Sequence, residues 1–295
     1  MAEKVIFSVI VPAYNRIDSL KLCIKSLLAQ STSKNEYEII VVDDGSTDGT
    51  YEKLSETYGV KVFRLEQRSG PAFARNYGAG KAEGLYLAFT DSDCVVPSDW
   101  LAKIGEGYEK NDVAGVGGAI VNTTNSTFSN LENFIYSKYK KANEPYLSTQ
   151  VDELPFALGN ISYKKSVFEE VGGFNIKIPF VSAGEDAELK RRILKKGYKL
   201  AFMPIIVNHN HKLDLKGFYN QSLIRGAGML LDSKLRGKMQ TRVAICLRLT
   251  VVKIYFIKCL IDLKNFDLAF KETIFYVFRN LGKLKYYDQI SKLDL

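Results

Sequence analysis

The 295-residue sequence is poor in the residues from which metal clusters and disulfide frameworks are built. It holds four cysteines, two histidines and one tryptophan. The cysteines lie far apart, at positions 23, 94, 246 and 259, and no two of them form a CxxC pair. This spacing argues against a zinc knuckle or a disulfide framework, so we expect the cysteines to fill space in a reduced core.

The sequence also lacks a secretory leader pattern and an uncharged run long enough to cross a membrane. Nothing before Val5 resembles a basic leader segment, and the apolar run Val5–Val11 stops at Pro12. A longer stretch, Val243–Ile261, carries three basic residues in its middle, where each charge would be costly inside a bilayer: Arg248, Lys253 and Lys258. We therefore expect a cytoplasmic location.

The excess positive charge is confined to the C-terminal region. Residues 1–233 contain 28 basic and 28 acidic residues, whereas residues 234–295 contain 13 and 5, which accounts for the net charge of +8. A balanced first region argues against a nucleic-acid partner. We predict one folded domain at 1–233 and a basic, apolar, helical tail at 234–295 that binds an anionic membrane surface peripherally, at its inner face. The alternative is a helical hairpin packed on the domain or on a partner chain.

The first hundred residues alternate β-branched runs with helical periodicity, which is typical of βαβ units. We expect an α/β fold with a mostly parallel central sheet flanked by helices, followed by an amphipathic helical tail. The expected strands are Val5–Val11, Glu38–Val42, Val60–Leu65, Leu85–Thr90 and Leu200–Val207. The expected helices include one that begins at Gly70-Pro71, one at Lys164–Val171 and one at Gly184–Lys196.

Polar residues follow three of the expected strands, where ligands of open α/β sheets bind. They are Pro12-Ala13-Tyr14-Asn15, Asp43-Asp44-Gly45-Ser46 and Asp91-Ser92-Asp93. Asp91 and Asp93 project to the same side of an extended segment, and two such carboxylates suit Mg²⁺ or Mn²⁺. The alternative for each acidic motif is a turn that caps the next helix, with Ser46 or Thr47 as the cap of the second motif.

Both histidines follow the expected strand that ends at Val207. Either imidazole could complete a metal site with Asp93, and we favour His209. In an extended segment His209 and His211 project to the same side, so the sequence does not separate them. The alternative is a surface loop in which one histidine packs against an aromatic ring.

Four motifs in order resemble the family 2 glycosyltransferases: Ser8–Asn15, Val41–Asp48, Gly70–Asn76 and Asp91–Asp93. The resemblance covers residues 5–230 and implies the glycosyltransferase A fold, a single nucleotide-binding α/β domain. It further implies an inverting transfer of a sugar from a nucleotide-diphosphate donor, with UDP expected, to an acceptor hydroxyl. Such reactions build cell-surface polysaccharide or glycolipid, so we expect a carbohydrate or glycolipid acceptor.

The resemblance also assigns roles to individual residues. The nucleotide-sugar side comprises Pro12, Ala13, Tyr14 and Asp43 around the base, Arg75 on the nucleotide, and Asp91 at the ribose or diphosphate. Asp93 would ligate the metal, and His209 would join it. On the acceptor side stand Gly159, Asn160 and Glu185, with Asp186 as the catalytic base. Glu185 to Glu188 fit equally well as an acidic first helical turn that complements the helix dipole.

Two other functions stay open at this point. A nucleotidyltransferase shares the α/β nucleotide site and acidic metal ligands, but it would be expected to have a Gly-rich phosphate loop after its first strand, which Pro12–Asn15 is not. A non-catalytic sugar-nucleotide-binding module would keep the crevice without the chemistry. The presence of Asp91, Asp93, Asp186 and His209 together argues against it.

Overall fold

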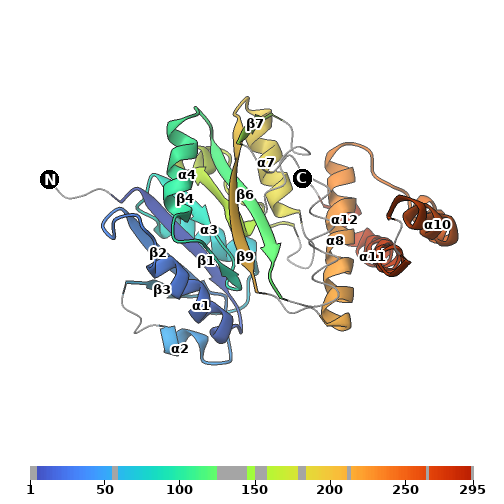
Figure 1. Ribbon diagram of the computed structural model, residues 1–295, viewed down its shortest axis with the longest axis horizontal. Coiled ribbons are helices and arrows are strands. Elements are labelled where there is room, and N and C mark those ends of the chain that lie inside the picture. Colours follow the sequence, from blue (N-terminus) through green and yellow to red (C-terminus); the bar gives the residue numbers. More distant parts are fainter. Residues whose placement is uncertain are drawn as a thin grey trace. The chain divides into compact units, whose positions relative to one another are not determined.

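The computed structural model describes residues 5–54, 59–124, 145–149, 158–178, 184–210, 214–263 and 266–293. The chain divides into two compact units (Figure 1). The first comprises Met1–Thr124, Tyr136–Asn175 and Leu189–His211, and the second comprises Asn125–Ile135, Ile176–Glu188 and Lys212–Leu295. The expected domain boundary at residues 233 and 234 falls within a helix of the second unit, and it stays a prediction.

The first unit begins with four parallel strands in the order β3-β2-β1-β4. They are β1 (Phe7–Ala13), β2 (Tyr37–Asp43), β3 (Lys61–Arg64) and β4 (Tyr86–Phe89). The crossovers contain α1 (Ile17–Leu28), α2 (Thr50–Leu54) and α3 (Pro71–Lys81). These elements confirm the βαβ pattern and the helix that begins after Gly70, with strand ends shifted by one or two residues.

The sheet continues from β4 through β8, β6 and β9 to β5, and β7 pairs with β9. These strands are β5 (Cys94–Val95), β6 (Gly115–Asn122), β7 (Tyr146–Ser148), β8 (Ile161–Lys164) and β9 (Leu200–His209). Only β6 and β9 run parallel here, so this half of the sheet is mixed. The helices are α4 (Trp100–Glu109), α6 (Lys165–Glu170), α7 (Glu185–Lys195) and the 3₁₀ turn η2 (Leu158–Asn160).

Alternation along the central strands forms two cores, one on each face of the sheet. In β1, Val9 and Val11 pack with α1 and α4, whereas Ile10 faces α3 on the other side. Successive side chains of a strand point to opposite faces, so a strand that is apolar throughout must be covered on both. The approach of α3 is close, because a Cβ on Gly78 would lie 2.7 Å from Cγ2 of Ile10.

The second unit is helical. It contains α8 (Leu215–Leu235), α9 (Arg242–Thr250), α10 (Val252–Leu263), α11 (Phe266–Lys285) and α12 (Tyr287–Ser291), which confirms a helical C-terminal region. α11 packs against both α8 and α10 (Figure 1). A Cβ on Gly226 or on Gly282 would lie within about 2 Å of backbone oxygens of the facing helix, so glycine sets this α8–α11 approach. No helix in the described ranges is long and apolar enough to cross a membrane.

Candidate functional site

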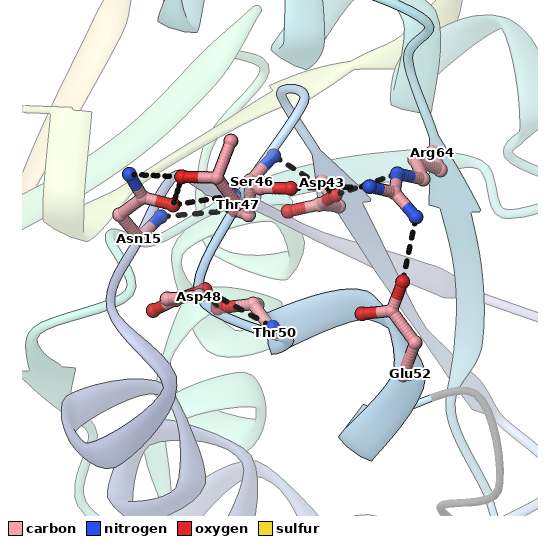
Figure 2. Close-up of polar contacts among 8 residues, drawn as sticks. All are labelled: Asn15, Asp43, Ser46, Thr47, Asp48, Thr50, Glu52 and Arg64. Atoms are coloured by element: carbon pink, nitrogen blue, oxygen red, sulfur yellow. Dashed lines mark hydrogen bonds and ion pairs between the residues drawn. The ribbon is translucent and has the colours of Figure 1, made fainter.

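The loops after β1 and β2 are tied together at the carboxyl end of the sheet (Figure 2). Ala13 and Asp43 are register partners at the ends of these strands. Asn15, at φ 50°, donates its backbone N–H to Oγ of Ser46 at 2.9 Å and accepts the N–H of Thr47 at 2.8 Å. These bonds hold the two motifs side by side before any ligand binds.

Asp43 is a fully buried carboxylate at this edge. Its Oδ2 accepts the backbone N–H of Ser46 at 3.2 Å and lies 3.7 Å from Nε of Arg64 (Figure 2). In the described part of the chain, no donor reaches its Oδ1. Burial raises the pKa of Asp43, while the Ser46 hydrogen bonds and the charge of Arg64 oppose the rise. Oδ1 is therefore a buried acceptor that a ligand N–H can satisfy.

Asp44 has a different task from its neighbour. Its two carboxylate oxygens accept the backbone N–H groups of Ser69 at 2.7 Å and Gly70 at 2.9 Å, directly before α3. This anchors the loop that leads into α3. The helix-cap alternative was wrong about Ser46 and Thr47, because Asp48 accepts the N–H of Thr50 at the start of α2 (Figure 2).

Tyr14 extends from the same edge as Pro12 and Ala13, which are the last two residues of β1 and are buried. The guanidinium of Arg68 lies 4.2 Å from the centre of the Tyr14 ring. A tyrosine ring and a guanidinium plane are both surfaces on which a nucleobase can stack.

Arg75 and Asp91 form a pair across α3 and the end of β4. Nη2 of Arg75 donates to Oδ1 of Asp91 at 2.7 Å, and the arginine is only 4% exposed. The next residue, Asn76, donates to the carbonyl of Phe174 and accepts its N–H, so it fixes a distant loop. Arg75 is thereby held with its charge against the first carboxylate of the DSD motif.

Gly159 and Asn160 lie in η2, immediately before β8. A Cβ on Gly159 would lie 3.0 Å from Sγ of Cys94 and 3.3 Å from Oδ2 of Asp91, so glycine permits a close approach here. Asn160 is fully buried and accepts the indole N–H of Trp100 at 2.9 Å. Its amide donates to backbone carbonyls of β6 and β9, where the register of that pair shifts. The side chain of Asn160 thus supports the sheet, and its acceptor-side role stays a prediction.

Asp93 and His209 meet because β5 pairs with β9. Cys94 and His209 are register partners, which places Nε2 of His209 3.1 Å from Oδ1 of Asp93. The expected strand ended at Val207, but β9 continues to His209, its last residue. Nη1 of Arg16 donates to the other oxygen of Asp93 at 2.5 Å. His211 lies outside the described residues.

Asp93, Cys94 and His209 each place one ligand atom within 4.8 Å of the other two. Burial raises the pKa of the Cys94 thiol, and the charges of Asp91 and Asp93 raise it further, so the thiolate that a metal requires is disfavoured. One carboxylate and one imidazole remain. That donor set fits a divalent ion with open positions, as Mn²⁺ or Mg²⁺ at a phosphate site requires.

The acceptor-side acids begin α7. Glu185, Asp186 and Glu188 lie in its first turn, and Gly184 precedes them at φ 122°. These residues belong to the second unit, whereas Asp91 and Asp93 belong to the first. The roles of Glu185 and Asp186 stay predictions.

The model of glycosyl transferase family 2 matches residues 8–172, which is more than half of the chain. The chain belongs to this family. It is 29% identical to the glycosyltransferase AglE of Haloferax volcanii, covering 66% of this chain and 63% of AglE. It is 31% identical to the succinoglycan biosynthesis protein ExoO of Rhizobium meliloti, covering 66% of this chain and 57% of ExoO. The chain thus spans about 60% of the length of these two relatives.

Solved structures share the fold of this family 2 chain. A structure of GalNAc-T7 with UDP, GalNAc and Mn²⁺ has a TM-score of 0.57 and 23% identity, covering 75% of this chain and 47% of GalNAc-T7. The mannosyltransferase PcManGT of Pyrobaculum calidifontis, solved with GDP-Man and Mn²⁺, has a TM-score of 0.61 and 18% identity, covering 99% of this chain and 77% of PcManGT.

Two residues with contacts at the candidate site were not assigned from the sequence. Arg16 directly follows the expected loop Pro12–Asn15, and a basic residue at a strand end was the signal that could have singled it out. The sequence placed Asp44 in the same motif as Asp43 but predicted no role for it. Its anchoring contacts involve Ser69 and Gly70, 25 and 26 positions away, and no local pattern encodes them.

Proposed function

We propose that this chain is a metal-dependent, inverting glycosyltransferase that moves a sugar from a nucleoside-diphosphate donor to an acceptor hydroxyl. The observation that carries the proposal is the pair of Asp93 and His209 at the carboxyl edge of the sheet, beside the tied loops of the nucleotide side. Residues 1–233 would form the catalytic domain. The acceptor would be a carbohydrate or glycolipid of cell-surface polysaccharide synthesis, as the name of the relative ExoO suggests.

The nucleotide side would offer contacts to each part of a donor. Oδ1 of Asp43 is a buried acceptor suited to a base N–H, and Pro12, Ala13 and Tyr14 would form the wall beside the base. Asp91, held by Arg75, would contact the ribose or diphosphate. Bound Mn²⁺ or Mg²⁺ would supply charge neutralisation at the leaving diphosphate. Asp93 and His209 would hold that ion.

The acceptor hydroxyl needs a base, and Asp186 is our assignment. It would remove the proton as the acceptor oxygen attacks the anomeric carbon and the bond to the diphosphate breaks, with Glu185, Gly159 and Asn160 on the acceptor side. One base and one charge-stabilised leaving group suffice for a single displacement, which inverts the anomeric centre. No nucleophilic carboxylate is required.

The tail offers a surface for binding an anionic membrane. The protein would then be cytoplasmic and would bind peripherally at the inner face of that membrane. Ile254, Ile257 and Ile261 follow one another at helical spacing on α10, and all three are exposed. They form a stripe with Lys258, also exposed, beside it. An apolar stripe bordered by basic residues binds at the lipid interface, while the basic excess of residues 234–295 attracts anionic headgroups.

A donor panel tests the proposal. UDP sugars and GDP sugars would be compared for the rise in melting temperature that they cause with and without Mn²⁺. Both nucleotides are included because GalNAc-T7 was solved with UDP and PcManGT with GDP-Man. We expect one donor to raise the melting temperature only with metal and to release its nucleoside diphosphate when acceptor is added. Asp93→Asn should abolish the metal-dependent shift, and His209→Ala should reduce it. Binding without turnover on any acceptor would favour a non-catalytic module, and a His209→Ala protein that behaves as wild type would favour His211 as the ligand.

A further inference from the structure

Lys283 is a buried charge in the helical second unit. It lies on α11, only 2% exposed, and its ammonium has one hydrogen-bond acceptor, Oε1 of Gln240 at a long 3.4 Å. In the part of the chain that the structure describes, no carboxylate lies within ion-pair distance of it. A buried ammonium that faces only a neutral amide is costly, because burial removes its hydration without a compensating charge.

The charged neighbours of Lys283 are themselves basic. Arg279 lies four residues before Lys283 on the same side of α11, and the carbonyl of Arg248 on α9 accepts the hydroxyl of Tyr276 on α11 at 3.2 Å. Burial and the charges of these two arginines together lower the pKa of Lys283 to about 8. The acidic side chains that the structure describes on the helices around α11 have other partners. Asp232 on α8 pairs with Arg236 at 2.8 Å, and Asp288 on α12 pairs with Arg242 at 2.5 Å. Glu272, which precedes Lys283 on α11, interacts electrostatically with Tyr255 of α10.

A second buried polar group lies near Lys283. Asn280 is 2% exposed and lies three residues before Lys283, on the same side of α11. Its Nδ2 donates to the carbonyl of Tyr276 at 2.9 Å, whereas no donor among the described residues reaches its Oδ1. A buried ammonium with one long hydrogen bond and an unsatisfied amide oxygen, within one helical turn, are groups that a polar ligand could satisfy.

We propose that Lys283, together with Arg248 and Arg279, forms a binding site for a phosphate group in the helical unit. Arg248 is exposed, so this member of the site faces solvent on α9. Two guanidiniums and one ammonium supply the charge-assisted donors that phosphate oxygens accept, and Asn280 can accept from a phosphate or sugar hydroxyl. The phosphate can belong to a lipid headgroup or be free in solution. This site is separate from sugar transfer and does not depend on it.

The test uses the full chain and the variant Lys283→Met, which keeps the length of the side chain and removes its charge. Without phosphate we expect the variant to melt at the wild-type temperature or above, because it relieves an unpaired buried charge. Inorganic phosphate should raise the melting temperature of the wild type and not of the variant, with about a tenfold or greater loss of phosphate affinity by calorimetry. Wild-type affinity should weaken as the pH rises through about 8.

Lys216→Met is the matched control, since Lys216 is an exposed lysine on α8 whose loss changes the net charge equally. Vesicles of phosphatidylcholine with and without phosphatidic acid form the second arm. A Lys283-dependent response to phosphatidic acid alone identifies a lipid headgroup, and a response to inorganic phosphate alone identifies a free phosphate. The proposal is overturned if neither ligand acts on the wild type, or if Lys283→Met responds as Lys216→Met does. Should Lys283→Met fail to fold, Arg248→Gln takes its place with the same expected loss. Donor-induced stabilisation, measured in parallel, reports separately on sugar transfer.

Discussion

The guanidinium of Arg16 forms a salt bridge with Asp93, the carboxylate that we assign to metal binding. Its Nη1 lies 2.5 Å from Oδ2 of Asp93, and Nε2 of His209 lies 3.1 Å from Oδ1 of the same residue. Arg16 reaches this position from the loop after β1, and its side chain is 42% exposed. A mobile cation on a carboxylate neutralises its charge and competes with an ion that needs the same oxygen.

The first prediction follows from this competition. Arg16→Ala should bind Mn²⁺ about tenfold more tightly than the wild type in the absence of nucleotide, because the metal no longer has to displace a charged partner. Titration of the protein with Mn²⁺ by calorimetry measures the difference. Arg16→Lys keeps the positive charge and should stay close to the wild type. Equal Mn²⁺ affinity of Arg16→Ala and the wild type would show that the Arg16–Asp93 salt bridge does not compete with Mn²⁺.

The second prediction concerns pH and Asp43. Burial raises the pKa of Asp43, so the fold favours its protonated form. Its contribution to stability is therefore greatest at low pH and is lost as the pH rises through the raised pKa. Donor affinity should change in the opposite direction, because a protonated carboxyl is a poorer acceptor for a base N–H. We expect affinity to fall on acidification, beginning at a higher pH than for an ordinary aspartate.

Asp43→Asn provides the comparison, since it keeps the shape of the side chain and removes the titration. Its donor affinity should be about tenfold weaker at neutral pH, the loss expected for one weakened charged hydrogen bond, and nearly constant between neutral and mildly acid pH. Calorimetry with the preferred nucleoside diphosphate at several pH values measures both proteins. Parallel pH profiles would assign the effect to another group.

The parts of the fold that the sequence predicted have local signatures. The apolar runs of β1 and β2 and the Gly70-Pro71 start of α3 carry their own pattern, and these elements lie where they were expected. β5 carries none, because it is only two residues long and exists through its pairing with β9. β6 was also missed, since its three glycines weaken the strand pattern and allow the close approach of β8 and β9.

The candidate site divides in the same way. Polar residues after β1, β2 and β4 were identified because the topology of an open α/β sheet brings such positions together. The salt bridge from Arg16 to Asp93 joins residues 77 positions apart, and the side-chain bonds of Asn160 depend on a register shift between β6 and β9. Neither follows from spacing or composition.

The third prediction tests the exposed stripe on α10. Replacing Ile254, Ile257 and Ile261 by Gln should reduce sedimentation with anionic vesicles about tenfold or more. In the bound protein, each of these isoleucines would bury apolar area in the lipid interface. The melting temperature should change little, since these side chains are exposed. Wild-type binding should weaken with salt, as screening reduces the attraction between basic residues and headgroups. Leu22→Gln, an exposed leucine on α1, is the control. Unchanged sedimentation of the triple variant would remove the stripe from membrane binding.

The last prediction assigns the base. Asp186 is the second residue of α7, in its acidic first turn. A base for a sugar hydroxyl needs reach and an ionised state, because the hydroxyl becomes acidic only as its bond to the anomeric carbon forms. Asp186→Asn keeps the size of the side chain and loses its ability to accept a proton. We expect its turnover to fall by about two orders of magnitude or more, with donor affinity nearly unchanged.

Glu185→Gln is the matched variant, one position away in the same turn and changed by the same chemistry. Turnover and donor affinity measured for both variants separate three cases. A dead Asp186→Asn beside an active Glu185→Gln supports Asp186, since a general effect on the helix start would reduce both. The reverse result makes Glu185 the base. If both variants turn over within a few-fold of the wild type, the acids of this turn only complement the helix dipole, and the proton goes to a residue elsewhere in the chain.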